Sequence, residues 1–412
     1  MSRYAPALVL SLLLTSPPAP AADSPPADPP LLHGNVQLVE SVPAETVLDL
    51  PDLPEARDVW PLLIAGARET LDIEVFYVSA DPGAPDALDV VLAEVAAAAD
   101  RGVRVRLLAD AGFHRTYPRW VDEIGALPGA EARLLDARAA WGGVQHAKFF
   151  VVDGRAAYVG SQNWDWRALE HINELGVRLD GPDPARAIRS IFEWDWALAG
   201  GREPPAGEPV HAGPWRLVVR GRGEVVASLA ASPPQALPAG IPHDEPLLVE
   251  LIDRAERELR LHLLSYNPSD RHGGYYATLD NALRRAAARG VSVRIILSNW
   301  SKRGYMLPYV KSLAVLDNVE VRFTNIPPWS GGFVSFARVE HPKYLVKDGD
   351  EAWLGTANWA RDYFHDSRNL SLFILGEAVA ADMARFFDLS WNSPYAETVD
   401  PAADYTPPRR EE

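Results

Sequence analysis

The sequence predicts an α/β fold: two tandem α/β sandwich repeats, related by pseudo-twofold symmetry, that meet at a shared interface. Three observations predict it. One polar motif occurs in each half of the 412 residues at the same internal spacing. Strand-like and helix-like segments alternate in the same order around each copy, as they do in α/β proteins. A stretch rich in Gly, Pro and Glu at 200–209 separates the halves.

Each half is expected to begin with an amphipathic helix that leads into a strand. In the first half we expect a helix at 63–71, a strand at 72–78, a helix at 87–101 and a strand from Val103. In the second half we expect a helix at 251–259, a strand at 260–266, a helix at 276–289 and a strand from Val291. Both Ala-rich helices end at a glycine, Gly102 or Gly290, the residue that often follows a last helical turn. The aliphatic runs that follow are typical of strands covered on both faces.

Each copy of the motif runs through an expected hairpin. The first copy reads His146-x-Lys148-x4-Asp153-x6-Gly160-Ser161-x-Asn163, and the second reads His341-x-Lys343-x4-Asp348-x6-Gly355-Thr356-x-Asn358. An Asp-Gly pair between strand-like runs is a strong hairpin signal, and each copy contains one. Alternate residues of a strand point to the same face, so each His and its Lys should line one wall of a cleft. A further strand should follow each hairpin, at 174–179 and 369–375.

The motif residues are of the types needed to break a phosphodiester without a metal ion. Lys148, Lys343, Asn163 and Asn358 can spread the charge of the phosphoryl group. One imidazole can attack phosphorus, while the second protonates the leaving oxygen and then activates water. Neither half contains both imidazoles, so we expect the site at the interface of the halves, with no metal and no cofactor.

The remaining motif positions leave alternatives open. Ser161 and Thr356 are expected either to donate hydrogen bonds to phosphate or to cap the turn that follows. Asp153 and Asp348 belong to the catalytic motif, but their place beside glycine favours a turn-forming role over direct catalysis.

One asymmetry suggests which imidazole does what. Glu174 in the first half corresponds to Asn369 in the second. A carboxylate beside an imidazole fixes its tautomer and stabilises its cationic form. We therefore expect Glu174 to orient His146 as the nucleophile, with His341 as the general acid and base.

Several aromatic residues lie close to the motifs in sequence. Trp164, Trp166 and Trp359 follow the motif asparagines, and core packing is favoured over stacking on a base or contact with lipid. Four further rings could form the mouth of the cleft, namely Trp141, Trp300, Trp329 and Phe333.

The beginning of the chain has the pattern of an export signal. A basic Arg3, an apolar run at 5–14 too short to cross a bilayer, and small residues around Ala21 predict a cleaved signal peptide, with an uncleaved anchor as the alternative. The expected organisation is a signal peptide at 1–22, a Pro-rich leader at 23–50, repeats at 51–200 and 246–398 around a connecting segment at 201–245, and an acidic tail at 399–412. A secreted or periplasmic location follows. The sequence contains no Cys, which excludes thiol nucleophiles, Cys-ligated zinc and disulfides.

The doubled motif resembles that of the phospholipase D superfamily, over roughly 55–397. Stretches at 160–169, 174–176, 355–359 and 391–395 look like its endolysosomal branch. That resemblance implies 5′-to-3′ exonuclease activity on single-stranded nucleic acid and, in some members, transfer of phosphatidyl groups. It also implies a catalytic pocket formed by His146, Lys148, Asn163, His341, Lys343 and Asn358. The branch contains disulfides, and this chain cannot. The preference for Arg over Lys and the cleavable-looking leader suggest a bacterial exported protein.

Three functions remain open. The first is a metal-independent phosphodiesterase that hydrolyses or transfers phosphatidyl groups of phospholipids through a phosphohistidine, with peripheral membrane contact. The second is a 5′-to-3′ exonuclease on single-stranded DNA or RNA, and the third is a noncatalytic phosphate-binding envelope protein. The net charge of −16 disfavours duplex nucleic acid and slightly favours lipid, whereas the branch resemblance favours the nuclease. The intact motifs argue against the third, and the oligomeric state stays open.

Overall fold

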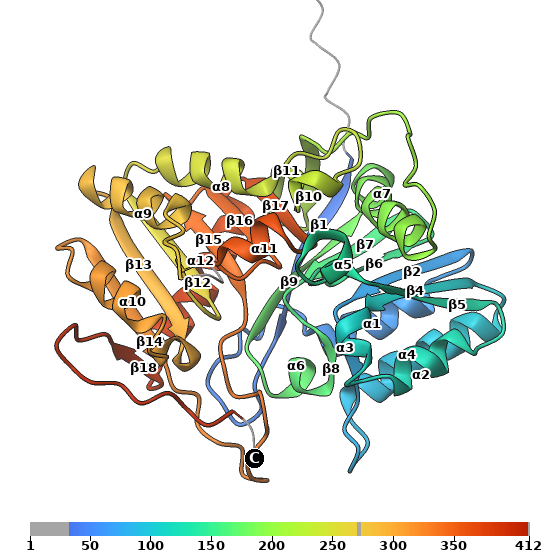
Figure 1. The fold of residues 1–412 in the computed structure, drawn as a ribbon, viewed down its shortest axis with the longest axis horizontal. Helices are drawn as coiled ribbons and strands as arrows, with labels where there is room; N and C mark the ends of the chain where they lie inside the picture. Colours follow the sequence, from blue (N-terminus) through green and yellow to red (C-terminus); the bar gives the residue numbers. More distant parts are fainter. Residues whose placement is uncertain (1–32, 270–272, 411–412) are drawn as a thin grey trace, which may run out of the picture. The chain divides into compact units, whose positions relative to one another are not determined.

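One mixed sheet runs through the described part of the chain, residues 33–269 and 273–410 of the computed structural model (Figure 1). The expected signal peptide and the start of the expected leader lie outside the described residues. The sheet has 16 strands in the order β18-β14-β13-β12-β15-β16-β17-β11-β10-β1-β9-β7-β6-β2-β4-β5. Read outward from the middle, β9-β7-β6-β2-β4-β5 repeats the order of β17-β16-β15-β12-β13-β14, which confirms the two-repeat α/β prediction.

The first repeat supplies the blue to green elements of Figure 1. Its strands are β1 (Gly34–Ser41), β2 (Thr70–Val75), β3 (Val78–Ser79), β4 (Arg104–Asp110), β5 (Ala130–Leu135), β6 (Phe149–Val152), β7 (Ala156–Gly160), β8 (Trp164–Asp165) and β9 (Glu174–Asp180). Its helices are α1 (Ala56–Ala65), α2 (Ala87–Asp100), α3 (Ala111–His114), α4 (Arg119–Gly125), α5 (Ala137–Trp141), α6 (Trp166–Glu170) and α7 (Pro182–Ala199). β3 and β8 pair with each other outside the large sheet.

The second repeat, in yellow to red, has the same plan. Two strands and a short turn connect the repeats: β10 (Trp215–Val219), β11 (Gly223–Ser232) and η1 (Pro234–Ala236). Then follow α8 (Asp244–Asp253), β12 (Glu258–Leu263), α9 (Thr278–Ala288), β13 (Ser292–Ser298), η2 (Asn299–Lys302), α10 (Leu307–Ala314) and β14 (Val319–Thr324). The chain ends with β15 (Lys343–Lys347), β16 (Glu351–Gly355), α11 (Arg361–His365), β17 (Asn369–Leu375), α12 (Glu377–Trp391) and β18 (Ala396–Thr398).

The two repeats share one apolar core at their junction. Ile191 and Phe192 of α7 belong to the same buried cluster as Phe386 and Phe387 of α12. Separate clusters lie under α1 and α2 in the first repeat and under α8 and α9 in the second. The shared cluster makes the interface of the repeats a continuous hydrophobic core, which fixes the two motifs relative to each other.

The prediction of a Pro-rich leader over 23–50 is wrong from residue 34 onward. Residues 34–41 form β1, which pairs with β9 along seven positions and with β10, in the middle of the sheet. Leu48 and Leu50 are buried behind it. The apolar residues of β1 therefore belong to the core, and the connecting segment at 201–245 likewise supplies strands, since β11 pairs with β17.

Two further expectations need correction. The helices predicted at 63–71 and 251–259 end earlier, at Ala65 and Asp253. The residues that follow, 66–69 and 254–257, form turns whose backbone N–H groups donate to the motif aspartates. The acidic tail at 399–412, for which the sequence predicts a loose conformation, packs over 399–410 on the second repeat, with Tyr405 edge-on to Phe323 at 5.2 Å and the Arg410 guanidinium over Trp300 at 5.0 Å. No helix within 33–269 and 273–410 is both long and apolar enough to cross a membrane.

Candidate active site

Both motif histidines line a single pocket. It has a volume of about 620 Å³, and its walls include His146 and Asn163 from the first repeat and His341 and Asn358 from the second. Each repeat thus supplies one imidazole and one carboxamide to the same space. The pocket therefore lies at the interface of the repeats, where the sequence predicts the site.

Backbone hydrogen bonds between the repeats bring the two histidines together. The amide of His146 donates to the carbonyl of Arg368 at 3.0 Å, and the amide of His341 donates to the carbonyl of Asn173 at 2.9 Å. Arg368 and Asn173 immediately precede β17 and β9. Each motif therefore enters its hairpin while bonded to the other repeat, and the site forms only when the repeats are joined.

The expected pairing of Glu174 with His146 is wrong. Glu174 accepts a hydrogen bond from Nδ1 of His341 at 2.7 Å, and Nδ1 of His146 lies 3.0 Å from Oδ1 of Asn369. The reason is the pairing between the repeats described above. The strand that begins at Glu174 contacts the motif of the second repeat, and the strand that begins at Asn369 contacts the motif of the first.

These partners fix the tautomer of both imidazoles. Asn369 uses Nδ2 to donate to the carbonyl of Tyr363 at 2.7 Å, so its Oδ1 faces His146 and accepts. Glu174 offers His341 only an acceptor. In the neutral form, each ring then carries its proton on Nδ1, and Nε2 is the nitrogen left with a lone pair.

Burial and like charges change the basicity of the pocket. Burial, together with the ammonium groups of Lys148 and Lys343, holds the pKa of His146 well below its usual range. Burial also lowers the pKa of His341, but the carboxylate of Glu174 opposes this effect. Burial lowers the pKa of Lys343 to about 7, and burial and the charge of Lys343 lower that of Lys148. Several basic groups gathered beside Glu174 are suited to hold an anion.

Similarity to known proteins identifies the family of this chain. The family model described as "Cardiolipin synthase, PLD-like domain" matches residues 62–196 and 248–391. The chain belongs to the phospholipase D superfamily. It is 31% identical over 388 residues to phospholipase D Z of Dictyostelium discoideum, covering 89% of this chain and 91% of that one. It is also 31% identical over 405 residues to human 5′-3′ exonuclease PLD3, covering 89% of this chain and 81% of that one.

Solved structures confirm the fold of this superfamily member. Phosphatidylserine synthase from Haemophilus influenzae Rd KW20 superposes with a TM-score of 0.60 at 14% identity, covering 83% of this chain and 85% of that one. At that identity the likeness shows the shared architecture of two repeats and not a shared substrate.

The motif lysines lie against the backbone of their own histidines. Lys148 and Lys343 are 2% and 1% exposed, and each ammonium donates to the carbonyl of the His two residues earlier. This contact fixes each ammonium beside its imidazole, in a space that a bulkier guanidinium would not fit without rearrangement.

Ser161 and Thr356 do not face the pocket as phosphate donors. The Ser161 hydroxyl donates to the carbonyl of Leu175 and accepts from the same residue's amide, both at 3.1 Å. Thr356 donates to Oδ1 of Asn369 and accepts from the amide of Leu370. Both hydroxyls therefore tie the hairpin to the next strand, and Thr356 also helps to orient the partner of His146.

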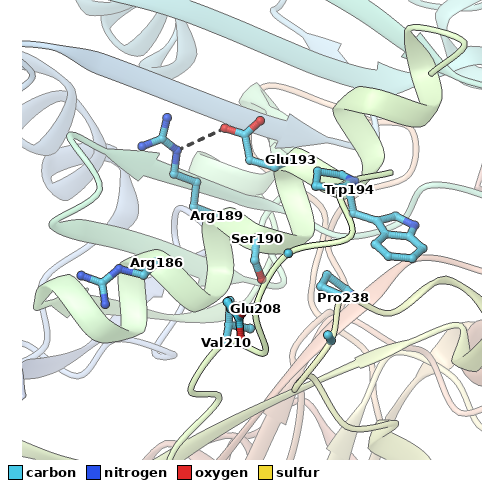
Figure 2. A pocket seen from close by; sticks show the side chains of 11 residues that line it. Arg186, Arg189, Ser190, Glu193, Trp194, Glu208, Val210 and Pro238 are labelled. Atoms are coloured by element: carbon cyan, nitrogen blue, oxygen red, sulfur yellow. Dashed lines mark ion pairs between the residues drawn. The ribbon is translucent and has the colours of Figure 1, made fainter. Parts of the chain in front are cut away.

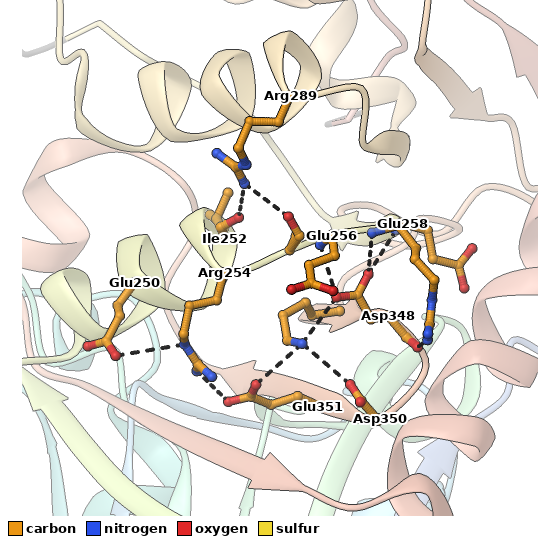
Figure 3. A network of polar contacts seen from close by, with 12 residues as sticks. Glu250, Ile252, Arg254, Glu256, Glu258, Arg289, Asp348, Asp350 and Glu351 are labelled. Carbon is orange, nitrogen blue, oxygen red and sulfur yellow. Dashed lines mark hydrogen bonds and ion pairs between the residues drawn. The ribbon is translucent and has the colours of Figure 1, made fainter.

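Asp153 and Asp348, grouped with the catalytic residues in the motif, take the turn-forming role. The Asp348 carboxylate accepts from the amides of residues 256–258, as Figure 3 shows, and that of Asp153 accepts from the amides of residues 68–70. Both residues have a φ of 52°. Neither lines the pocket; each connects its hairpin turn to the loop that leads into β2 or β12.

The lining of the pocket contains aromatic residues that the sequence pattern did not reveal. They are Phe76, Tyr77, Phe113, Tyr117 and Tyr363. The rings of Phe76 and Tyr363 lie edge-on to His146 at 5.1 and 4.8 Å. These residues have no shared spacing with the motif, and only the fold brings them to it.

The aromatic residues named from sequence divide into groups. Trp164 and Trp359 are buried in the repeat cores, as favoured. Trp300 lines the pocket, Trp141 lies under Arg368, and Trp329, Phe333 and Trp166 line a neighbouring cavity. A different cavity of about 400 Å³ beside α7, lined by Trp194 and Pro238, contains no motif residue (Figure 2).

Proposed function

We propose that this phospholipase D superfamily member is a phosphodiesterase that shortens single-stranded nucleic acid from its 5′ end through a phosphohistidine. The observation that carries the proposal is the pair of imidazoles, His146 and His341, that line one pocket, each with a buried lysine bonded to its own backbone carbonyl. Such a pair can divide the reaction into formation and hydrolysis of a covalent intermediate.

The environments of the imidazoles support a division of labour. His146 has the more strongly suppressed basicity and a neutral partner, so its Nε2 is available to attack phosphorus. His341 is supported by Glu174 and is the better proton holder. The P–N bond forms as the P–O bond to the leaving group breaks, and His341 gives its proton to that oxygen. His341 then takes a proton from water, which attacks phosphorus and releases a phosphomonoester and neutral His146.

Glu174 thus supports the acid and not the nucleophile. We still propose His146 as the nucleophile and His341 as the general acid and base. The reason is now the lower basicity of His146, and not a carboxylate beside it. Asn163 and Asn358, both on the pocket wall, are placed to bind the nonbridging oxygens.

The lining of the pocket favours nucleic acid over lipid. The aromatic rings that line the pocket offer stacking surfaces, and Arg138 and Arg410 line the same pocket. None of the large apolar side chains found exposed in the described residues lines this pocket, although Phe333 lines the cavity next to it. Relatives named 5′-3′ exonuclease support the same choice.

Phospholipid is the second candidate, because a relative of equal identity is named phospholipase D Z. One comparison separates the two. The purified protein is given a 5′-hydroxyl single-stranded oligonucleotide and, separately, phosphatidylcholine with a primary alcohol, both in EDTA. We expect the oligonucleotide to shorten and the lipid to stay intact. His146→Ala and His341→Ala should abolish shortening, while His211→Ala, an exposed histidine outside the pocket, should retain it. Headgroup exchange with an intact oligonucleotide would overturn the nuclease proposal.

Export is a further proposal. We propose a secreted or periplasmic protein cleaved near residue 22, supported by the basic and apolar pattern of the first residues. Sequencing the amino terminus of the mature protein tests it, and an intact Met1 would contradict cleavage.

A further inference from the structure

A second cavity adjoins the active-site pocket. Its volume is about 670 Å³, and it shares Tyr117 and Arg167 with the pocket that contains the imidazoles. No residue of the two motifs lines it. A ligand that fills one cavity can therefore extend into the other past the same two side chains.

Aromatic rings from both repeats form the walls of this second cavity. Trp120 comes from α4 and Trp166 from α6, while Trp329 and Phe333 lie in the segment between β14 and β15 of the second repeat. His171 connects the sides, with ring centres 5.1 Å from Trp166 and 5.0 Å from Trp329. The cavity spans the repeat interface, as the catalytic pocket does.

These rings are only partly buried, although Trp120 and Trp166 also pack against the core of the first repeat. Phe333 is 44% exposed, and the three tryptophans are half-buried, in contrast to Trp164 and Trp359 at 1% and 2%. Large rings that keep one face toward solvent inside a single cavity mark a binding surface.

The partition between the cavities is rigid. Arg167 is buried, forms a bidentate ion pair with Asp165, and donates to the carbonyl of Ser335 in the other repeat at 3.2 Å. Tyr77 donates to the same aspartate at 2.7 Å, and its ring stacks on Tyr117 at 4.8 Å. The charge of Arg167 is thus largely neutralised by Asp165, and Tyr117 is the aromatic residue that lines both cavities.

We propose that the second cavity binds the nucleosides that follow the scissile phosphate of a single-stranded nucleic acid, by stacking of their bases on these rings. This inference rests on the proposed function. Bases stack on aromatic side chains whatever their identity, so the cavity would lengthen the site without selecting a sequence. The exposed Arg119, whose guanidinium lies over the Trp120 ring at 4.4 Å and pairs with the carboxylate of Glu123 at 2.9 Å, could exchange that surface ion pair for a backbone phosphate.

The test compares substrates that do and do not reach the second cavity. Steady-state rates are measured on 5′-hydroxyl oligothymidylates from dimer to hexamer and on bis(p-nitrophenyl) phosphate, which is small enough for the catalytic pocket alone. Binding of the same oligonucleotides to His146→Ala is followed by fluorescence anisotropy. The variants are Trp120→Ala, Trp166→Ala and Trp166→Phe. Trp194→Ala is the matched control, since Trp194 is a half-buried tryptophan in the cavity of Figure 2, which shares no residue with the catalytic pocket.

We expect the wild-type KM to fall from the dimer to the hexamer, and the alanine variants to lose about ten- to a hundredfold of that gain. Turnover of the small ester should stay unchanged, Trp166→Phe should recover most of the loss, and Trp194→Ala should resemble wild type. Thermal unfolding of each variant checks that the fold is intact.

Two results would overturn the inference separately. If the oligonucleotides are cleaved but the gain with length is absent or survives in Trp120→Ala and Trp166→Ala, the second cavity is not a nucleotide subsite and the proposed function stands. If the small ester is turned over while oligonucleotides neither bind nor react, the nuclease proposal fails, and the subsite fails with it.

Discussion

The carboxylate of Glu174 lies 2.7 Å from Nδ1 of His341, although the two residues belong to opposite repeats. Both are buried, and the equivalent contact in the other direction, Asn369 with His146, has an amide in place of the carboxylate. The two halves of a nearly symmetric site thus differ by one charge. That difference gives the two imidazoles unequal basicity and leads to the predictions below.

Replacing Glu174 by Gln should weaken the general acid. The Glu174 carboxylate raises the pKa of His341 against the effect of burial, so its loss lowers that pKa further. His341 must be protonated to donate, and the alkaline limb of kcat should therefore move to lower pH. We expect a loss of about a hundredfold near neutral pH, measured on an oligonucleotide. An unchanged pH profile would show that Glu174 only supports the fold.

Replacing Asn369 by Asp should shift the acidic limb of the pH profile of kcat. A carboxylate beside Nδ1 would raise the pKa of His146, so the neutral nucleophile would form only at higher pH. The acidic limb of kcat should move up by about one pH unit or more. The same substitution should leave the alkaline limb in place, which distinguishes it from general damage to the pocket.

The covalent intermediate should form on His146. In His341→Ala, a p-nitrophenyl phosphodiester needs no acid for its leaving group, so one equivalent of nitrophenol should appear in a burst, followed by slow hydrolysis. His146→Ala should give no burst. Quenching in alkaline denaturant and mapping the adduct by mass spectrometry checks the assignment, and an adduct on His341 in the wild-type protein would reverse it.

The motif aspartates should matter for stability more than for turnover. Asp348→Ala removes an acceptor for the amides of residues 256–258, and we expect it to cost about 2–3 kcal/mol in urea unfolding. Turnover of the small ester below the melting temperature should stay within about twofold of wild type. A large loss of turnover at unchanged stability would instead give Asp348 a catalytic role.

The same contact predicts a pH dependence of stability. Burial opposes the shift, but backbone N–H groups and Lys347 hold the pKa of Asp348 below its usual value of 3.8. A carboxyl whose pKa is lower in the folded protein stabilises it above the unfolded pKa and loses that contribution as pH falls through the folded one. The stability difference between wild type and Asp348→Asn should therefore shrink below about pH 4.

Much of this protein could be predicted because it is encoded locally. The repeated motif identified both histidines, both lysines and both asparagines, and the alternation of β-branched runs with Ala-rich segments gave the α/β repeats. The Asp-Gly turns marked both hairpins, since a turn's backbone conformation depends on the few residues within it.

Other features depended on contacts between distant residues. The pairing of Glu174 with His341, the second bond of Thr356, the place of β1 in the middle of the sheet and the contacts of Arg410 all join residues far apart in the chain. The sequence by itself determined which chemical groups the site contains and how each repeat folds. Only the tertiary structure decided which imidazole received the carboxylate and which rings surround the pocket, because strand pairing across the repeat interface is set by packing of the whole core and not by any local pattern.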